Sequence, residues 1–413
     1  MMIHQSGVRR VAPILLLALA AACGREERRE AVSSTRSGPA CVSRAEGSRW
    51  AGTYRVGGVF GDTDEEALSG IFLAGIAATD SVVYVLELGR PRLWLLRPDL
   101  TPVRTVGREG RGPGEWKFFP PSNQGGSMGW VNADSTRVLL FDGTRVQEFG
   151  PEGRFRRLAL TERTATGISF GQSRLRFTGG NLLYSDGGYD ASGPTHRRAE
   201  PVGGKSLWRV RVRDRSHDRA VLTLGLVPIP RGRGIGPTQA RPLWDARGAC
   251  VVASDGAEPL LLSASVDGSR PDTAKVELPE RWGDPESDAA ALRGALPPGA
   301  RIEQPTVRVR IRDLILDPDG YVWLLPVQPG EGIQGGVEVV RVAVANGRSE
   351  RDTVPAFPRA FGRPGVFYAE TYADDGSIRV VRYDQQQSDQ RSTPKRPPEV
   401  HGAGSIAQGR DAP

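Results

Sequence analysis

Histidine and cysteine, which often supply catalytic bases, nucleophiles and metal ligands, are scarce in this chain. Its 413 residues include four histidines and three cysteines. His4 and His401 lie close to the two ends, and His196 and His217 lie in segments that we predict to be loops. No Cys/His spacing resembles a zinc site. We therefore expect no histidine-dependent hydrolytic site, and we assign no catalytic residue from the sequence.

Lysine and long hydrophobic runs are also scarce. Only four of the 55 basic residues are lysines, so arginine supplies nearly all of the positive charge. The net charge of +7 is scattered along the chain rather than clustered, and it predicts no nucleic-acid partner. Beyond residue 22 no apolar run approaches the roughly 20 residues that a membrane span needs.

Glycine and proline, in contrast, are abundant. The chain has 52 Gly and 32 Pro, which is well above average usage. Both residue types favour turns, and a helical bundle would not tolerate so many of them. The composition therefore favours an all-β fold of short strands.

One pattern recurs six times, a turn followed by a short apolar strand. The turns lie at residues 79–81, 133–135, 179–181, 246–248, 317–320 and 363–365. The strands predicted after them cover residues 82–86, 137–141, 182–184, 249–253, 321–325 and 366–368. Successive turns are 45 to 72 residues apart, which suits four-stranded antiparallel propeller blades of about 40–50 residues, two of them with insertions.

A second hairpin follows most of the first ones, for example at residues 93–106 and at 260–278, where the last strand is predicted at 275–278. The sixth unit lacks this hairpin, and residues 50–59 precede the first unit without a hairpin of their own. We predict that these N-terminal residues complete the last blade and close the ring, which leaves only short sheet edges. The predicted fold is an all-β, six-bladed β-propeller over residues 50–386.

The N-terminus has the pattern of a secretory signal, with Arg9-Arg10 before an apolar run that ends at Cys23. The segment resembles a bacterial lipoprotein signal over residues 1–22, which implies that Cys23 is lipidated and becomes the mature N-terminus. An ordinary cleaved signal is the alternative, and both export the chain. The resemblance implies membrane attachment through the lipid, on the periplasmic or cell-surface side of the envelope and at the outer membrane.

The two remaining cysteines, Cys41 and Cys250, have two interpretations. In an oxidising compartment they could form a disulfide that ties the N-terminal segment to the folded body, or they could be two separate thiols. We interpret residues 23–49 as a flexible stalk and residues 387–413 as a disordered tail, because the tail has almost no large apolar side chains. We also predict one helix over residues 284–296.

Two motifs resemble a known family. Residues 106–116 read Val-Gly-Arg-Glu-Gly-Arg-Gly-Pro-Gly-Glu-Trp, and residues 317–323 read Asp-Pro-Asp-Gly-Tyr-Val-Trp. Both are similar to signatures of bacterial six-bladed β-propeller lipoproteins, relatives of the NHL-repeat propellers. The resemblance implies the fold and an envelope location, but it implies no reaction.

Two predicted strands each place three arginines on one face. The six residues are Arg209, Arg211 and Arg213 in one strand and Arg308, Arg310 and Arg312 in the other. They are candidate ligands for carboxylates or phosphates, because a guanidinium binds both bidentately. The alternative is that these are exposed outer strands of an arginine-rich protein.

Two further segments are expected to be structural. The acidic segment 62–66 lacks the glycine that an EF-hand calcium loop needs. The loop 107–115 lacks the Lys-Ser/Thr pair of a phosphate-binding loop. We therefore assign no cofactor, although calcium in the central channel stays open without a motif to support it.

From these observations we expect a binding or scaffolding module of the envelope rather than an enzyme. Its partner would be an envelope protein or a glycan, docked on a ring face or at the channel mouth where loops from all blades converge. The alternative is a metal-dependent propeller enzyme, lactonase-like or lyase-like. A sensor for small anions is a third interpretation, and it requires the arginine strands to face the channel.

Overall fold

A computed structural model describes Cys41 and residues 53–68, 73–87, 90–116, 129–142, 145–161, 175–178, 181–187, 189–190, 197–198, 206–213, 218–226, 243–268, 271–280, 282, 310–326 and 336–386. All of them belong to the compact unit Pro39–Pro413. The predicted leader, the predicted helix at 284–296 and the predicted tail lie outside the described residues, as does the predicted stalk apart from Cys41.

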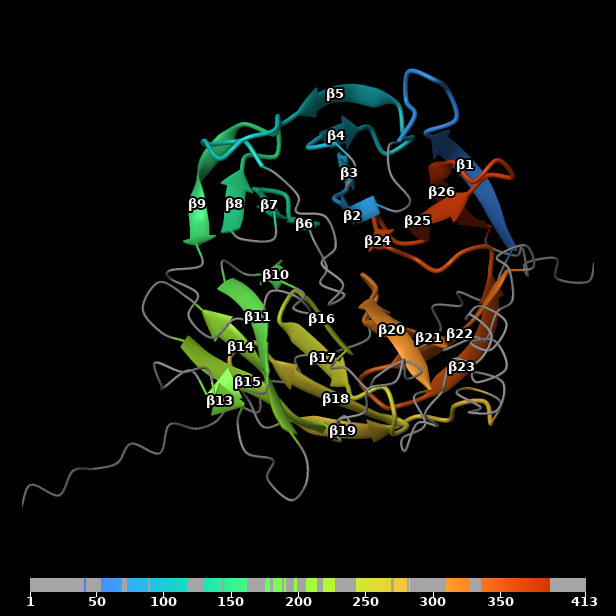
Figure 1. The fold of residues 1–413 in the computed structure, drawn as a ribbon. Coiled ribbons are helices and arrows are strands. Elements are labelled where there is room, and N and C mark those ends of the chain that lie inside the picture. The colour runs from blue at the N-terminus through green and yellow to red at the C-terminus, as the bar shows by residue number, and fades with distance from the viewer. Residues whose placement is uncertain are drawn as a thin grey trace, which may run out of the picture. The chain divides into compact units, whose positions relative to one another are not determined.

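The described strands form six four-stranded antiparallel sheets, which we number as blades 1 to 6 (Figure 1). Blade 1 contains β2 (Leu73–Ala78), β3 (Val83–Glu87), β4 (Leu93–Leu96) and β5 (Pro102–Val106). Blade 2 contains β6 (Trp130–Ala133), β7 (Val138–Phe141), β8 (Arg145–Phe149) and β9 (Phe155–Thr161). Blade 3 contains β10 (Leu175–Thr178), β11 (Asn181–Gly187), β14 (Ser206–Arg213) and β15 (Asp218–Leu226).

The second half of the chain repeats this plan. Blade 4 contains β16 (Leu243–Arg247), β17 (Cys250–Ser254), β18 (Leu260–Ser265) and β19 (Asp272–Lys275). Blade 5 contains β20 (Ile311–Leu316), β21 (Tyr321–Pro326), β22 (Val337–Ala343) and β23 (Ser349–Val354). Blade 6 contains β24 (Ala360–Phe361), β25 (Val366–Tyr372), β26 (Ile378–Gln386) and β1 (Thr53–Phe60). A small sheet of β12 (Tyr189–Asp190) and β13 (Arg197–Arg198) lies in the insertion of blade 3.

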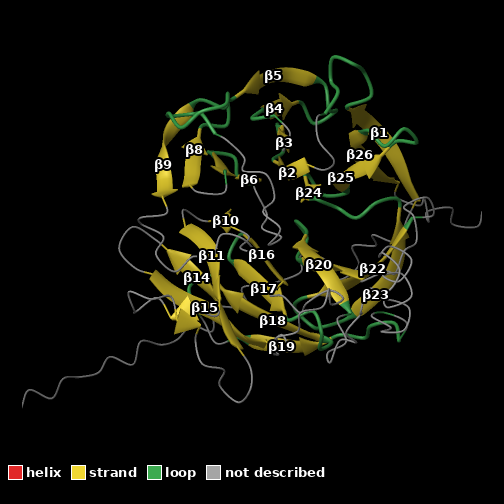
Figure 2. Ribbon diagram, viewed as in Figure 1, coloured by secondary structure: helices red, strands yellow, loops and turns green. Residues whose placement is uncertain are grey.

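This arrangement confirms the predicted six-bladed β-propeller. Each of the six predicted turns joins the first strand of a blade to its second. The predicted closure is also confirmed, because β1 pairs antiparallel with β26 from Thr53 opposite Gln386 to Phe60 opposite Val380. Figure 2 shows strands and loops throughout the described chain. None of its segments is a helix long and apolar enough to cross a membrane.

One predicted strand was misplaced. The last strand of blade 4 covers Asp272–Lys275 rather than residues 275–278. The prediction followed the apolar residues, but Val276 and Leu278 are buried beyond the end of the strand, against blade 5. The strand itself is polar and largely exposed because it forms the outer edge of its blade.

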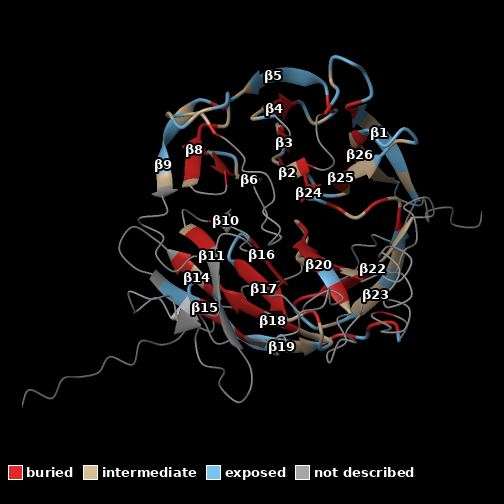
Figure 3. Cartoon of the chain, in the orientation of Figure 1, coloured by how far each residue is buried: buried red, intermediate tan, exposed pale blue. Residues whose placement is uncertain are grey.

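The burial of each strand follows its position in the blade (Figure 3). All residues of β3 and β4 are buried, whereas most residues of β5 and β1 are exposed. A middle strand is covered on both faces by neighbouring blades, so it is apolar along its whole length. An outer strand packs on few neighbours and can carry polar side chains.

The described apolar residues form six clusters, one at each contact between neighbouring blades. The cluster between blades 6 and 1 joins Phe60 and Val380 to Val85. The cluster between blades 4 and 5 joins Val252 to Leu316 and includes Cys41. Burial between blades is the main stabilising contribution to a ring of this kind, and it fixes the first strands around a central channel.

Candidate functional site

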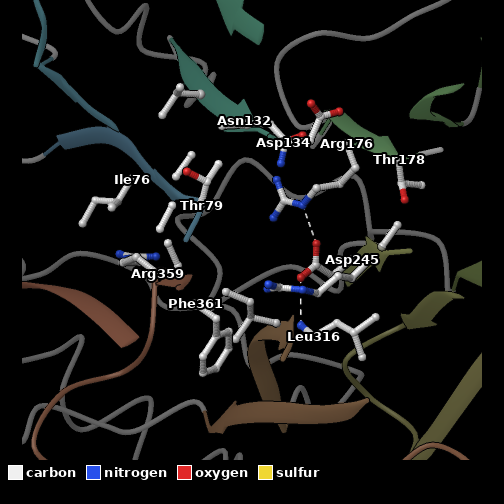
Figure 4. A pocket seen from close by; sticks show the side chains of 18 of the residues that line it. Ile76, Thr79, Asn132, Asp134, Arg176, Thr178, Asp245, Leu316, Arg359 and Phe361 are labelled. Atoms are coloured by element: carbon white, nitrogen blue, oxygen red, sulfur yellow. Dashed lines mark hydrogen bonds and ion pairs between the residues drawn. The ribbon is translucent and has the colours of Figure 1, made fainter. Parts of the chain in front are cut away.

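The first strands of all six blades line one cavity of about 310 Å³ in the central channel (Figure 4). The cavity extends to the turns that follow these strands. Its charged lining residues are Asp80, Asp134, Arg176, Asp245, Arg247 and Arg359. The rest of the lining is mainly small or apolar, so these six side chains decide what the cavity can bind.

Asp245 joins three blades at the channel wall. It lies in the middle of β16 and is 3% exposed. Its Oδ1 accepts a hydrogen bond from Arg176 Nε of blade 3, and its Oδ2 accepts one of 2.8 Å from the backbone N–H of Leu316 in blade 5 (Figure 4). Charge-assisted bonds of this kind offset the cost of burying a carboxylate. The Asp245–Arg176 pair is therefore part of the wall.

Arg247 is the last residue of β16, and Asp80 lies in the turn after β2; both line the cavity and both are exposed. Neither side chain makes a hydrogen bond or an ion pair with the described part of the chain. Partial loss of hydration in the channel lowers the pKa of the Arg247 guanidinium, while the charges of Asp245 and Asp317 raise it. These two residues are the charged groups that a ligand in the channel can reach most readily.

Other polar groups of the lining are used to shape the turns. Asp134 Oδ1 accepts backbone N–H bonds from Thr136 at 2.7 Å and from Arg137 at 3.0 Å. Thr178 Oγ1 donates to the carbonyl oxygen of Gly248. Asp134 therefore fixes its own turn, and Thr178 joins blade 3 to blade 4.

Arg359, just before β24, is the third arginine of the cavity. Its guanidinium lies 3.6 Å from Asp313 Oδ2 and 3.8 Å from Glu370 Oε2, and its side chain is 49% exposed. Both carboxylates are largely buried. Two long ion-pair contacts hold the guanidinium at the wall, while about half of the Arg359 side chain is exposed to solvent.

The glycine-rich loop 107–116 links blades 1 and 2. Trp116 is fully buried and packs edge-on against Phe149, with ring centroids 6.0 Å apart. Gly107 has φ +99°, and a Cβ there would lie 2.0 Å from the Trp116 ring. Only glycine combines this left-handed backbone with so close an approach.

The amide groups of this loop already have partners. Gly110 N–H donates to the Trp116 carbonyl at 3.3 Å, and Gly112 N–H donates to Glu115 Oε2 at 2.8 Å. Gly114 N–H donates to Gln147 Oε1 at 3.1 Å. These three amides are therefore not available to cradle a phosphate.

The hairpin 317–323 is organised by a buried carboxylate. Asp317 is 1% exposed, and its Oδ1 accepts backbone N–H bonds from Asp319 at 2.9 Å and from Tyr321 at 2.8 Å. Its Oδ2 accepts a bond of 2.9 Å from Trp323 Nε1. Burial raises the pKa of Asp317 to about 6, although these three hydrogen bonds lower it. The spacing of the motif is explained by these contacts.

The arginine strands predicted as an anion site lie on two blades separated by blade 4. Arg209 and Arg211 belong to β14 of blade 3, whereas Arg312 lies on β20 of blade 5 and Arg310 directly precedes it. Arg209 and Arg312 are exposed, and the other two are half-buried. None of these four lines the channel cavity. The side chain of Arg213 and all of Arg308 lie outside the described residues.

Cys41 and Cys250 are joined by a disulfide, with their Cα atoms 4.9 Å apart. Both are buried in the cluster between blades 4 and 5. The bond links positions 209 residues apart, so it ties the N-terminal segment to the folded body. Cys23 lies outside the described residues.

The acidic segment 62–66 forms an exposed turn after β1. Asp62 pairs with Arg379, and Glu66 Oε2 accepts the backbone N–H of Gly61 at 3.4 Å. No group of three or more His, Cys, Asp or Glu side chains in the described part of the chain is placed to hold a metal ion.

The channel arginines and Asp245 were missed by the sequence analysis. The sequence did hold a signal for Asp245, because it interrupts the apolar run Leu243-Trp244-Asp245-Ala246 in a strand that precedes a predicted turn. A charged residue inside such a run is buried with a partner or faces a cavity. Arg176 and Arg359 carry no comparable signal, because arginine is common throughout this chain.

Comparisons with known proteins identify no family. No protein-family model and no curated protein sequence matches the chain. Among solved structures, a member of the DUF4221 family from Bacteroides vulgatus is similar, with 10% identity, TM-score 0.46, and 81% of this chain and 97% of that chain covered.

Two other solved structures are similar. One, described only as a candidate exported protein of Bacteroides fragilis, has 11% identity and TM-score 0.42, with 81% of this chain and 95% of that chain covered. A gluconolactonase of Xanthomonas campestris has 11% identity and TM-score 0.38, with 77% and 88% covered. All of these TM-scores are below 0.5, so the assignment of this chain as a six-bladed β-propeller rests on its own strand pairing.

Proposed function

We propose that this protein is an exported, lipid-anchored β-propeller that acts as a binding or scaffolding module on the periplasmic or cell-surface side of the bacterial envelope. The central cavity carries the proposal. Residues of all six blades line it, and its buried carboxylate, Asp245, is paired with Arg176. Arg247 and Asp80 have no hydrogen bond or ion pair with the described residues, so they can contact a ligand. A cavity of this design favours holding a polar group.

Two observations support export. The N-terminal sequence resembles a lipoprotein signal that ends at Cys23, and Cys41 is joined to Cys250 in a disulfide. Disulfides persist in oxidising compartments outside the cytoplasm. The lipid on Cys23 would then attach the propeller to the membrane through the segment before Cys41.

The arrangement of the charged groups favours binding over catalysis. A general acid or base needs a titratable group that is free to exchange its proton with a substrate. Asp134 and Asp245 are instead held by hydrogen bonds to a turn and to the wall. Asp80 has no such bond, but the described lining offers it no His, Cys or second unbonded carboxylate with which to act as an acid–base pair. We infer that a polar or charged portion of an envelope protein or glycan docks against Arg247 and Asp80.

Ligand retention by the full chain, purified from the membranes of exporting cells, tests this proposal. The double variant Arg247→Gln/Asp80→Asn should retain soluble envelope glycan fragments or partner peptides on the order of a hundredfold more weakly, because it removes two charged contacts and each is worth on the order of 1.5 kcal/mol. The matched control Arg348→Gln/Asp375→Asn changes two exposed turn residues away from the cavity and should bind like the wild type. Equal retention by all three proteins would exclude the channel as the site.

Fractionation tests the anchor separately. The Cys23→Ser variant should lose its lipid and leave the membrane fraction, since the lipid is the proposed attachment. A variant that stays on the membrane would contradict the lipid anchor without affecting the channel proposal.

A metal-dependent enzyme receives no support from the described residues, because they offer no group of metal ligands. A thermal melt in excess calcium should match one in excess chelator. A metal at about 100 times its dissociation constant would add roughly 2.7 kcal/mol to the free energy of unfolding. A clear upward shift of the melting temperature with calcium would favour the enzyme.

A further inference from the structure

A second cavity, of about 280 Å³, lies where the ring closes between blades 6 and 1. We call it the seam cavity. It is lined by the turn between β4 and β5, by the turn between β24 and β25, and by residues of β25 and β26. Thr79 and Asp80 line both the seam cavity and the channel cavity, so the two are neighbours.

Three arginines line the seam cavity. Arg382 is fixed in the wall, because its Nε and Nη2 donate to Asp384 Oδ1 at 2.9 and 2.6 Å and its Nη1 donates to the Pro98 carbonyl at 3.1 Å. Arg97 and Arg363 are exposed, and their side chains form no hydrogen bond or ion pair with the described residues. Two arginines from different blades therefore line one small cavity, and neither side chain has a hydrogen bond to the described residues.

The acidic residues of this cavity have other contacts. Asp99 Oδ1 accepts the backbone N–H of Thr101 at 3.0 Å, and this bond is the main reason why the pKa of Asp99 is lowered. Asp80 lies at the side of the channel, where its charge acts on Arg247. The lining therefore carries three arginines and two aspartates, an excess of one positive charge, and Arg97 lies close enough to Asp99 for its charge to help lower the pKa of that carboxyl.

The turn that carries Arg97 is held rigidly in an unusual conformation. Leu100 has φ +72°, the one positive value for a non-glycine residue in the described chain, and its side chain is 2% exposed. The Pro98 carbonyl accepts bonds from Tyr368 Oη at 2.9 Å and from Arg382. A left-handed leucine persists only where the surroundings over-determine it, and such sites cluster at ligand-binding positions.

We propose that the seam cavity is a binding site for a phosphate group, held between Arg97 and Arg363. A phosphate monoester carries about −1.5 to −2 charge at pH 7, which matches the charge of two guanidinium groups. Arginine binds phosphate bidentately, so two arginines can engage all three terminal oxygens. The phosphate could belong to a soluble ester or to a lipid headgroup. This site is separate from the proposed channel function and does not depend on it.

Titration calorimetry of the full chain with inorganic phosphate tests the site. The wild type should bind at millimolar phosphate, and Arg97→Gln and Arg363→Gln should each weaken binding about tenfold, the effect expected for one charged contact. Arg104→Gln is the matched control, because Arg104 is an exposed arginine of the same blade that does not line the cavity. Its affinity should equal that of the wild type.

Three results would overturn the proposal. They are no binding up to about 10 mM phosphate, an equal loss of affinity in Arg104→Gln, and equal affinity for succinate, which would indicate carboxylate recognition. Titration with glycerol 3-phosphate and with vesicles containing phosphatidic acid then distinguishes the two sources of the phosphate. Tighter binding of glycerol 3-phosphate than of inorganic phosphate indicates a soluble ester, and tighter binding of the vesicles indicates a lipid headgroup. Ligand retention in the channel should be the same in Arg97→Gln and wild type, so failure of one proposal can be told from failure of the other.

Discussion

Trp116 and Trp323 are both fully buried between neighbouring blades, and each follows a carboxylate in its own motif, Glu115 directly before Trp116 and Asp317 six residues before Trp323. Glu115 stays at the surface, where the backbone N–H of Gly112 and the ion pair with Arg108 lower its pKa. Asp317 is buried, and burial raises its pKa to about 6. Both motifs end in a tryptophan and contain a carboxylate, but they hold their tryptophans in different ways.

The two indoles show the same contrast. Trp116 Nε1 has no hydrogen-bond partner among the described residues, so its ring is held by shape alone. Trp323 Nε1 donates to Asp317 Oδ2, and the Arg341 guanidinium lies 5.4 Å from the ring centroid. The first motif therefore holds Trp116 by close packing alone. The second holds Trp323 by close packing and also by a hydrogen bond to a buried carboxylate.

Removal of the two rings should have the largest effect. Trp116→Ala and Trp323→Ala should each lower the free energy of unfolding by about 4 kcal/mol, the usual cost of deleting a buried aromatic ring. Trp323→Ala should be the worse of the two, because it also deprives Asp317 and Arg341 of a partner. Urea unfolding measures both, with Val103→Ala at an exposed position as control. Equal losses would break the proposed contrast.

The pH dependence of stability should separate the motifs next. The folded protein holds the Asp317 proton more tightly than the unfolded chain does, so its contribution to stability is fully present below about pH 4 and is lost as the pH rises through 6. A rise in pKa from 3.8 to about 6 corresponds to about 3 kcal/mol. The difference between wild type and Asp317→Asn, measured by urea unfolding from pH 4 to pH 7, should show this slope. Parallel pH profiles would contradict the raised pKa.

The glycine of the first motif offers a matched test of the close packing around Trp116. Gly107 and Gly376 both have positive φ, but a Cβ at Gly376 would meet nothing within 4 Å whereas one at Gly107 would strike Trp116. Gly107→Ala should therefore be about 2 kcal/mol more destabilising than Gly376→Ala, the typical cost of overpacking. Thermal or urea unfolding of the two variants measures the difference. Similar stabilities would show that only the backbone conformation matters.

Glu115→Gln should give the smallest effect. Because the folded-state pKa of Glu115 is lowered, its contribution is present above the unfolded pKa and is lost as the pH falls, opposite in sign to Asp317. The Glu115 side chain lies partly in solvent and its partner Arg108 is exposed, so solvent screens the pair and the change in stability should be slight. Unfolding at pH 3 and pH 7 tests the sign. A slope of the same sign as that of Asp317 would refute the comparison.

Much of the fold could be predicted because it depends on local pattern. The six turns, the middle strands and the closure by residues 53–60 all follow from turn residues and apolar runs. The last strand of blade 4 could not be placed by the same rule, because Asp272–Lys275 is an exposed edge and its apolar neighbours pack beyond it. Hydrophobic residues show which positions are buried. They show which positions pair in a sheet only where the paired strand is also the buried segment.

The site depended on contacts that no local pattern reveals. Asp245 meets Arg176 from a blade 69 positions away and the Leu316 amide from another blade 71 positions away. Arg97 and Arg363 share a cavity because β1 closes the ring at their seam. The six arginines singled out from the sequence were chosen because they alternate along a strand, and alternation says which residues share a face but not what that face meets.

The sequence by itself determined the all-β class, the number of blades and the way the ring closes, because turn chemistry and strand hydrophobicity act over a few residues. Only the tertiary structure decided which charges line the channel, how Asp317 is buried and bonded to Trp323, and that two arginines from the first and last blades line the same cavity. Those outcomes depend on which blades become neighbours, and charge pairing and burial act through space rather than along the chain.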